Sequence, residues 1–600
     1  MGKNTIAPDL MAILSSKINS ISKQMSYTLQ RSARSSVMSS ARDFSTAICD
    51  GVGDVLALPN GFPVHVANMS LTSKSIFEFH SVDTLAPGDA ILNNSPYHGN
   101  THMGDHTIIV PVFHEGELMF LCTVRGHQAD IGNSVPTTYH ALAKDIFEEG
   151  ALCFPCVKIQ KNYEDVEDLI RMAKMRIRVP DVWYGDYLAM IGAARIGERE
   201  LTKLIEKYGK ETVRTFCKEW QDYGKKRMIE EIKKLPEGTW FNESSHDPIP
   251  GVLPDGVTVK VKLSILPEDG LIEVDFTDNI DPVACGLNLC EATVLSAGRT
   301  GVLNYLPAGL PLCEGTFSRI IVKMRDHSAI GRVSHPYSSS LATTNLADRA
   351  ILAVQCAFNK IGDNLGMAEG AFAQPPSLSV ISGYDSRYKR PYVTQLISGH
   401  SGGMGVYGHD GFVTYCICNG AMMEWNSLEV IEQKYPIQYI KQEIITDSGG
   451  AGQWDGAPAT KVIMKAREDK VTSMYVCDGK YNPPRGAKGG YNGSPAKAAM
   501  YEVAKGEDNS IELPMFHGLD LMPGEALVSE ISSGGGYGDP LNRDPEKVRH
   551  RVREGWITEQ KAKEVYGVVL NTTSELYTVN YSATELLRQV LKKGGKYYGI

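Results

Sequence analysis

The sequence predicts an α+β fold in which mixed and antiparallel sheets form several layers. Helix-like segments gather in some blocks of the chain and strand-like segments in others. The regular alternation of single strands and helices that is typical of parallel α/β folds is not visible. Hydrophobic residues make up 42% of the 600 residues and charged residues 22%, so the chain can form a globular core.

The first predicted region, residues 1–245, begins and ends with helices. Apolar residues recur every third or fourth position over residues 9–30, which predicts a helix there. The Asp50-Gly51 step between two apolar runs predicts a tight hairpin, and short strands are expected from residue 63 to about 124. Three helices then follow, over residues 165–178, 183–207 and 210–234.

Three further regions complete the predicted organisation. Residues 246–430 form an α+β middle region that contains an alternating hairpin (257–278), helices (290–306 and 340–360) and a glycine-rich segment with strands (380–420). Residues 431–540 are rich in strands. Residues 541–600 form a helical tail that begins with two short helices.

Composition and charge exclude several classes of protein. The formal net charge of −9 offers no basic surplus for nucleic acid. No apolar stretch is long enough to cross a membrane, and the N-terminus has no signal-peptide pattern. Twelve cysteines in 600 residues are too sparse for a disulfide framework. We therefore expect a soluble, cytoplasmic protein with reduced thiols.

Possible metal ligands are most concentrated in residues 98–130. Two His-x-x-Asp pairs, His102/Asp105 and His127/Asp130, lie at the ends of two apolar strands joined by a turn at residues 114–117. If Phe113 pairs with Leu118, Asp105 faces Gly126 and His127 faces Gly104. The two pairs then meet at the open end of one hairpin, where the glycines leave room for a divalent ion such as Zn, Mn or Fe. Alternatively, these are polar side chains of surface loops.

Asp43 follows the first helix and precedes a strand. Its carboxylate fits three roles: a metal ligand, a helix cap or a partner of Arg42. The spacing alone leaves all three open.

Two other motifs lack the structural context that they need. Residues 399–403 match the Gly-x-Ser-x-Gly pattern around Ser401, and residues 403–408 match part of a dinucleotide fingerprint. Both motifs require a helix directly after them, whereas the sequence continues with glycines and the strand-like residues 412–418. No Walker A motif occurs, so nothing in the chain indicates ATP binding.

Several blocks in this order resemble the hydantoinase B/oxoprolinase family. They are NNSPYHGNTHMGDHTIIVPVF (93–113), RGHQADIG (125–132), EEGALCFPCVKI (148–159), RIGERE (195–200), DFTDN (275–279), EVIEQKYPI (429–437), DSGGAGQWDG (447–456) and GGGYGDP (534–540). The first two blocks are specific, and together the blocks cover nearly the whole chain. The resemblance implies one large hydantoinase B-like subunit rather than a string of modules.

The resemblance also implies a two-part, ATP-dependent enzyme. A hydantoinase A-like partner uses ATP to phosphorylate a carbonyl oxygen, and the B-type subunit completes either ring opening of a cyclic amide or carboxylation of a ketone. The ligand positions of metal-containing members fall on Asp43, His102, Asp105 and His127, with Zn or Mn as the favoured metal. In this chain the family's Gly-Gly-x-x-Pro-Gly-Ser-like stretch is replaced by residues 132–145, which leaves the substrate class open.

The favoured function is therefore that of a metal-dependent subunit of an ATP-dependent cyclic-amide hydrolase. The alternatives are a ketone carboxylase subunit, for which a small third subunit is expected, and a non-catalytic scaffold for the ATPase. Intact residues at all four ligand positions argue against the scaffold. Other candidate site residues are Asp130, as an imidazole-orienting group or base or alternatively as a loop-capping carboxylate, His98 and Glu149 as pocket residues, and His400 and Ser401 as substrate or partner contacts.

Overall fold

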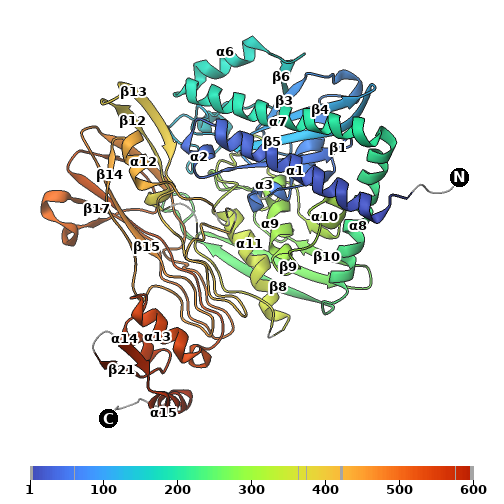
Figure 1. The fold of residues 1–600 in the computed structure, drawn as a ribbon. Coiled ribbons are helices and arrows are strands. Elements are labelled where there is room, and N and C mark those ends of the chain that lie inside the picture. Colours follow the sequence, from blue (N-terminus) through green and yellow to red (C-terminus); the bar gives the residue numbers. More distant parts are fainter. Residues whose placement is uncertain are drawn as a thin grey trace.

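The helices and strands of the computed structural model gather in separate layers, as the α+β prediction requires (Figure 1). The structure describes residues 5–594 except residues 60, 363, 373–374, 419, 421–422 and 574–575. Within these residues no helix is long and apolar enough to span a bilayer. All twelve cysteines are free thiols.

A seven-stranded antiparallel sheet forms the first layer, in the order β2-β1-β5-β4-β3-β6-β7. Its strands are β1 (Phe44–Asp50), β2 (Val55–Ala57), β3 (Ala90–Asn93), β4 (Asp105–His114), β5 (Glu117–His127), β6 (Val157–Lys161) and β7 (Glu164–Asp165). Alternate side chains reach opposite faces, since Ile108 and Val110 join one apolar cluster and Ile109 joins another. The sheet is therefore buried on both sides.

Two long helices, α1 (Pro8–Ser32) and α7 (Pro180–Tyr208), cover one face of this sheet (Figure 1). The predicted apolar stripe of α1 is its buried side, which includes Leu14, Ile18, Met25 and Leu29. The other two predicted helices are α6 (Glu167–Arg176) and α8 (Lys210–Ile232). The Asp50-Gly51 hairpin is present as β1 and β2.

The expectation of strands from residue 63 onward is wrong up to residue 84. This segment forms α3 (Pro63–Val66), α4 (Met69–Lys74) and the short 3₁₀ helices Ser75–Glu78 and Val82–Thr84. Helices of one turn or little more show no helical period in the sequence. The first two pack against α9 (Glu291–Leu303), since Asn68 Nδ2 donates to the Ala292 carbonyl and Ser296 Oγ donates to the Val64 carbonyl. There burial overrides the strand preference of the Val residues.

The second layer is a four-stranded sheet in the order β11-β10-β9-β8, covered by α9 and α11 (Leu346–Ala357). Its strands are β8 (Gly238–His246), β9 (Val257–Leu266), β10 (Leu271–Asp275) and β11 (Ile320–Lys323). Both α9 and α11 lie within the segments predicted to be helical, and β9 and β10 form the predicted hairpin. The remaining short helices of this half are α2 (Ser36–Ser39), α5 (Ile146–Glu149), α10 (Glu314–Phe317) and the 3₁₀ helix Phe358–Lys360.

Two further sheets pack against each other in the second half of the chain. One has the order β13-β12-β16-β19 and the other β14-β15-β20-β17-β18, with Ile381, Tyr392, Met464 and Leu527 in the core between them. The strands are β12 (Val380–Asp385), β13 (Arg390–Gln395), β14 (Ile437–Ile444), β15 (Thr460–Ala466), β16 (Val471–Val476), β17 (Lys497–Glu502), β18 (Ile511–Glu512), β19 (Phe516–Leu521) and β20 (Glu525–Glu530). Helix α12 (Leu428–Lys434) and the 3₁₀ helices Pro376–Leu378, Val503–Lys505 and Glu507–Asn509 lie between these strands in the chain.

Residues 412–418 do not form the strand that their sequence suggests. They are turns and irregular backbone, joined to Ser401 by one isolated bridge at Tyr415. The predicted helical tail contains α13 (Pro545–Arg553), α14 (Glu559–Glu564) and α15 (Tyr581–Lys592), with a β21 (Leu570–Thr573) and β22 (Leu576–Val579) hairpin that the sequence did not predict. A 3₁₀ helix, Pro540–Asn542, precedes it. The four-region division of the chain stays a prediction.

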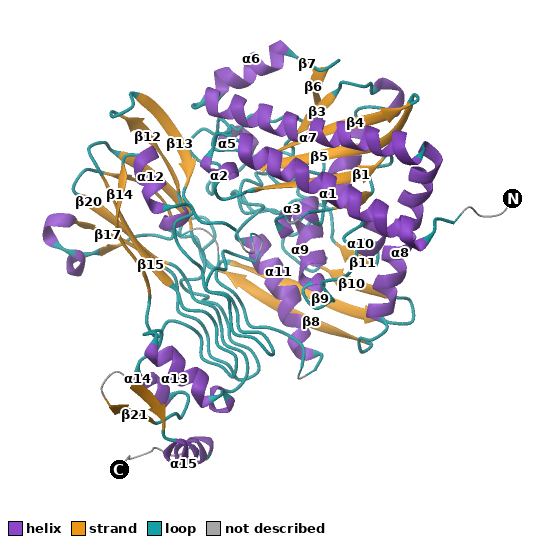
Figure 2. Ribbon diagram, in the orientation of Figure 1, coloured by secondary structure: helices purple, strands orange, loops and turns teal. Residues whose placement is uncertain are grey.

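Extended glycine-rich segments run side by side below these sheets and form what we term the glycine-loop bundle (Figure 2). Its segments are residues 402–405, 449–456, 485–493 and 533–538. Backbone hydrogen bonds join them, as from the Gly405 N–H to the Gly535 carbonyl at 2.9 Å and from the Gly450 N–H to the Gly534 carbonyl at 3.0 Å. A Cβ atom on Gly534 would lie 1.9 Å from the Gly403 carbonyl oxygen. The backbones of these segments therefore approach more closely than any side chain would allow.

We expect Gly534→Ala to destabilise the protein by about 2 kcal/mol or more, because the added methyl meets rigid backbone. Gly192→Ala is the matched control, since a Cβ at this helical position of α7 has no neighbour within 4 Å. That variant should be neutral or more stable by about 0.5–1 kcal/mol. Thermal unfolding midpoints measure both, and equal midpoints would contradict the packing argument.

Candidate metal centre

The β4–β5 hairpin brings the predicted ligand pairs to its open end, with a register that differs from the expectation by one residue. Phe113 pairs with Leu118 as predicted, but a bulge follows, and Val112 pairs with Phe120. Asp105 therefore faces His127 directly, and the prediction that it faces Gly126 is wrong. A single extra residue on β5, Met119, causes the shift, and nothing in its sequence distinguishes it from a paired residue.

His102, Asp105 and His127 form a compact, fully buried cluster. One ligand atom from each lies within 4.8 Å of the others. The Asp105 Oδ1 atom is 3.2 Å from Nε2 of His102 and 3.1 Å from Nδ1 of His127. Gly104 lies against both rings, where a Cβ atom would come within 2.5 Å of His102. The glycine thus provides the space that the sequence predicted.

Asp43 belongs to the same site. Its carbonyl oxygen accepts a hydrogen bond from the His127 N–H at 3.0 Å, and β1 continues from Asp43 alongside β5. Asp43 lines a small cavity of about 40 Å³ together with Asp105 and His127. Arg42, the alternative partner of the carboxylate, instead pairs with Glu424. The structure thus gathers the four residues that the family resemblance implies.

The charges of this site are unevenly compensated. Burial alone would raise the pKa of Asp105, but His102 and His65 lower it well below its ordinary value. Burial, together with the negative charge of Asp105, raises the pKa of Asp43 well above its ordinary value. Burial also lowers the pKa of His127, so this imidazole favours the neutral form that donates a lone pair.

His65 is a site residue that sequence reasoning missed. Its Nε2 atom lies 3.1 Å from Asp105 Oδ2, and its Nδ1 atom lies 3.3 Å from Ser45 Oγ. Thr101 Oγ1 also donates to Asp105 Oδ2. One oxygen of Asp105 is thus fixed from outside while the other faces the imidazoles. The sequence carries no spacing signal for His65, because it comes from the short helix α3, 40 residues before Asp105.

The unusual loop of residues 132–145 lies directly on the cluster. Thr138 Oγ1 is 3.0 Å from His127 Nε2. The Tyr139 ring stacks on His102 and His127, with centroid separations of 5.7 and 5.3 Å. The segment that is expected to depart from the family pattern therefore forms one wall of the site.

Of the remaining predicted site residues, Glu149 contacts a loop that supports the cluster. It is buried, its Oε2 accepts a hydrogen bond from Ser338 at 2.7 Å, and burial raises its pKa. Two residues along the chain from Ser338, the Ser340 carbonyl lies 2.9 Å from His102 Nδ1. Glu149 thus supports the loop that orients His102 and does not belong to the ligand cluster.

Asp130 does not orient an imidazole. Its Oδ1 accepts from the Arg178 guanidinium at 3.1 Å and from the Gly132 N–H at 3.2 Å, while its Oδ2 accepts from the Arg178 N–H. These contacts give the loop-capping role. His98 lies at the surface, where its Nδ1 atom is 3.2 Å from Glu78 and its ring packs on Phe79. Its predicted place in the pocket is wrong.

His400 and Ser401 are not among the residues that line the cavity of the ligand cluster. The His400 ring packs on Trp425 with a centroid separation of 3.7 Å. Ser401 is fully buried, and no helix follows it among the described residues up to residue 418. The structure therefore supports the rejection of the Gly-x-Ser-x-Gly motif as a nucleophile elbow, and it leaves Ser401 no surface for a partner.

The donor set suits a borderline divalent cation. Imidazole nitrogens and carboxylate oxygens are the usual ligands of Zn²⁺ and Mn²⁺, and two carboxylates in one buried cavity repel each other unless a cation lies between them. Outer contacts such as those of His65 and Ser340 are typical of metal sites, where they fix the ligating side chains.

Comparisons with known proteins agree with this architecture. The caprolactamase subunit beta of Pseudomonas jessenii is 28% identical over 598 residues, which cover 96% of this chain and 98% of that protein. The crystal structure of the ATP-dependent caprolactamase from Pseudomonas jessenii matches with a TM-score of 0.87 and 25% identity, over 98% of this chain and 100% of that one. A nucleotide-free acetone carboxylase structure also matches with a TM-score of 0.87, over 98% of this chain and 83% of that one, and at 19% identity it shows a shared fold.

The model of the hydantoinase B/oxoprolinase family matches residues 8–540, which include all the residues of the candidate centre. The predicted relationship is confirmed, and the chain belongs to the hydantoinase B/oxoprolinase family.

Proposed function

We propose that this chain is the metal-dependent B-type subunit of a two-component, ATP-dependent enzyme that opens a cyclic amide. The observation that carries the proposal is the buried His102–Asp105–His127 cluster, with Asp43 on the same cavity. The name of its relative, a caprolactamase subunit beta, supports a lactam or a similar cyclic amide as the substrate class.

The centre would bind a divalent ion through His102, Asp105, His127 and Asp43, with Zn²⁺ or Mn²⁺ favoured by the donor types. Such an ion polarises a carbonyl or phosphoryl oxygen and lowers the pKa of a bound water to about 7. The amide carbonyl, a poor electrophile, would be activated beforehand by phosphorylation of its oxygen.

The residues around the cluster would hold the ligands and exclude bulk water. The Ser340 carbonyl accepts from His102 Nδ1, which leaves the Nε2 lone pair directed at the cluster. His65 and Thr101 fix the outer oxygen of Asp105. Tyr139 stacks on both imidazole rings and would shield them from bulk water.

ATP would be used by a hydantoinase A-like partner subunit. The chain has no Walker A motif, and the relatives are named as a subunit beta and as an ATP-dependent caprolactamase. A subunit without its own phosphate-binding loop depends on a partner for the activation step.

Ketone carboxylation is the second candidate. The observation that favours it is the altered 132–145 loop, since Thr138 and Tyr139 contact the centre itself and so change the wall that a substrate meets. A small third subunit would accompany this activity.

ATP turnover by the chain purified with its ATPase partner tests the proposal. We expect hydrolysis of ATP to rise with caprolactam or hydantoin, without bicarbonate, and to fall at least about a hundredfold in the Asp105→Asn variant. Stimulation by a ketone alone, and only with bicarbonate, would replace the first candidate by the second. Full turnover in Asp105→Asn would reject a metal-dependent role in either reaction.

A further inference from the structure

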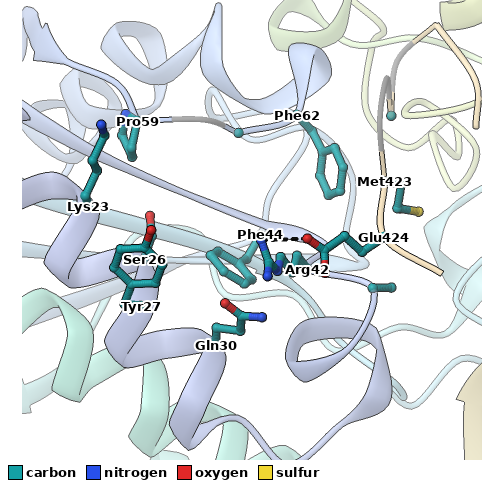
Figure 3. A pocket seen from close by; sticks show the side chains of 13 residues that line it. Lys23, Ser26, Tyr27, Gln30, Arg42, Phe44, Pro59, Phe62, Met423 and Glu424 are labelled. Atoms are coloured by element: carbon teal, nitrogen blue, oxygen red, sulfur yellow. Dashed lines mark ion pairs between the residues drawn. The ribbon is translucent and has the colours of Figure 1, made fainter. Parts of the chain in front are cut away.

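A larger pocket lies directly outside the metal cavity. It has a volume of about 470 Å³ and is formed by α1, the Ala41–Phe44 turn, residues near Phe62 and the segment at Met423 (Figure 3). Phe62, Gly420 and Met423 line both this pocket and the 40 Å³ cavity of the cluster. We term it the outer pocket. The outer pocket and the cavity of the cluster thus share part of their walls.

The chain turn between Arg42 and Phe44 connects the two spaces. Arg42 has a φ of +59°, which a non-glycine residue adopts at a cost, and the Phe44 N–H donates to the Arg42 carbonyl at 2.7 Å. The turn places the Asp43 side chain on the inner cavity and the Arg42 side chain on the outer pocket. The backbone strain at Arg42 therefore lies where the guanidinium in the outer pocket is next in the chain to Asp43, the candidate metal ligand of the inner cavity.

The Arg42 guanidinium has one exposed anionic partner, Glu424, which another anion could replace. Its guanidinium is 2.7 Å from Glu424 (Figure 3). The Gln30 side-chain oxygen, in the amide orientation that satisfies both partners, accepts from the Arg42 Nε at 2.7 Å. The side chains of Arg42 and Glu424 are 45% and 50% exposed, and ion pairs this exposed contribute little to stability. An incoming anion can therefore replace Glu424 at small cost.

A second cation, Lys23 of α1, lines the same pocket. Among the residues that the structure describes, no carboxylate lies within ion-pair distance of its ammonium group. Ser26 and Tyr27, one turn of α1 further on, add hydroxyl groups to the wall (Figure 3). The Ser26 hydroxyl is hydrogen-bonded to Thr46 Oγ1 at 2.8 Å, so the donors left for an oxyanion are one guanidinium, one ammonium and the Tyr27 hydroxyl.

We propose that the outer pocket is an anion-binding site that receives the phosphoryl group of an activated substrate, with Arg42 and Lys23 as its binding residues and Glu424 as the internal counter-ion of the empty state. This proposal rests on the proposed function for the identity of the ligand, since that function delivers a phosphorylated carbonyl to this subunit.

Calorimetric titration with inorganic phosphate tests the site on the full chain, with and without prior removal of metal by a chelator. We expect Arg42→Met to weaken phosphate binding at least about tenfold, because it removes a charge-assisted contact. Lys23→Met should weaken it by a smaller factor. Arg31→Met and Lys17→Met, which remove the same charges from exposed positions of α1 outside the pocket, should leave the affinity unchanged.

Glu424→Gln gives a result that loss of folding cannot imitate. Without the competing carboxylate, phosphate binding should become tighter than in the wild type. Equal affinity in the wild type, Arg42→Met and Glu424→Gln would overturn the proposal. Tighter binding of bicarbonate than of phosphate, lost in Arg42→Met, would overturn the phosphoryl assignment.

Metal analysis of the same preparations separates this proposal from the proposed function. Phosphate binding that depends on Arg42, in a chain that takes up no divalent ion even when Zn²⁺ or Mn²⁺ is added, would reject the metal-dependent function and retain the anion site. A metal-loaded chain whose phosphate affinity is unchanged in Arg42→Met would reject the anion site and retain the metal-dependent function.

Discussion

His102→Ala and His127→Ala should each empty the metal centre. Each variant removes one of three buried candidate ligands whose donor atoms lie within 4.8 Å of one another. A divalent ion held by the remaining groups would lose a strong nitrogen ligand in a site from which water is largely excluded. We expect metal content to fall from about one ion per chain to below about a tenth of that in either variant.

Two further variants should give an intermediate and an unchanged metal content. His65→Ala leaves all four candidate ligands in place but removes the His65 contact to the outer oxygen of Asp105, so metal affinity should fall by about 10–100-fold while some metal remains. His98→Ala is the matched control, because this imidazole lies at the surface beside Glu78. Its metal content should equal that of the wild type.

Elemental analysis after gel filtration measures all four variants, and thermal midpoints show whether each is folded. Unchanged metal content in both His102→Ala and His127→Ala would disprove the site. A loss as large in His98→Ala as in His127→Ala would show that the metal is held elsewhere or lost through unfolding.

The sequence could place this hairpin because its turn is local. The HEGE turn and the two apolar runs determine which strands pair, and pairing brings residues 22 positions apart to one end. The bulge beside Phe113 was not predictable, because both Met119 and its neighbours are apolar and fit either register. The error was one residue, and it exchanged Gly126 for His127 as the partner of Asp105.

The surroundings of the centre were beyond sequence reasoning for a different reason. His65 and Ser340 contact the cluster from segments that are distant in the sequence. The ion pair between Arg178 and Asp130 is likewise a long-range contact. Asp105 and Asp130 have the same spacing from a histidine, yet one is a candidate ligand and the other a loop cap. The difference lies in partners supplied by other elements, which no local spacing encodes.

A buried ion pair joins the second layer to the C-terminal sheets and gives the second large expected effect. The Arg349 guanidinium of α11 contacts both oxygens of Asp478, at 2.8 and 3.1 Å, and donates to the Asn482 carbonyl at 2.9 Å. The Arg349 guanidinium carbon also lies 3.5 Å from the centroid of the Phe372 ring. Both charged side chains are at most 1% exposed.

Arg349→Met should destabilise the protein by about 3–5 kcal/mol, because it keeps much of the side-chain volume but leaves the Asp478 carboxylate buried without its cation. Lys470→Met is the control. It breaks an ion pair with Asp520 that is about half exposed, and should cost at most about 1 kcal/mol. Thermal midpoints at neutral pH measure the difference.

The pH dependence distinguishes a lost ion pair from lost packing. Burial alone would raise the pKa of Asp478, but Arg349 and His246 hold it below its ordinary value. In the wild type the pair therefore stabilises the protein fully above the unfolded-state pKa of about 3.9, and this contribution falls as the pH drops through the lower folded-state pKa. In Arg349→Met burial dominates, so the carboxyl binds a proton more readily folded than unfolded, and its penalty grows as the pH rises. The gap in midpoint between the two proteins should thus be smaller at about pH 5 than at about pH 8, and a gap that is constant with pH would assign the effect to packing instead.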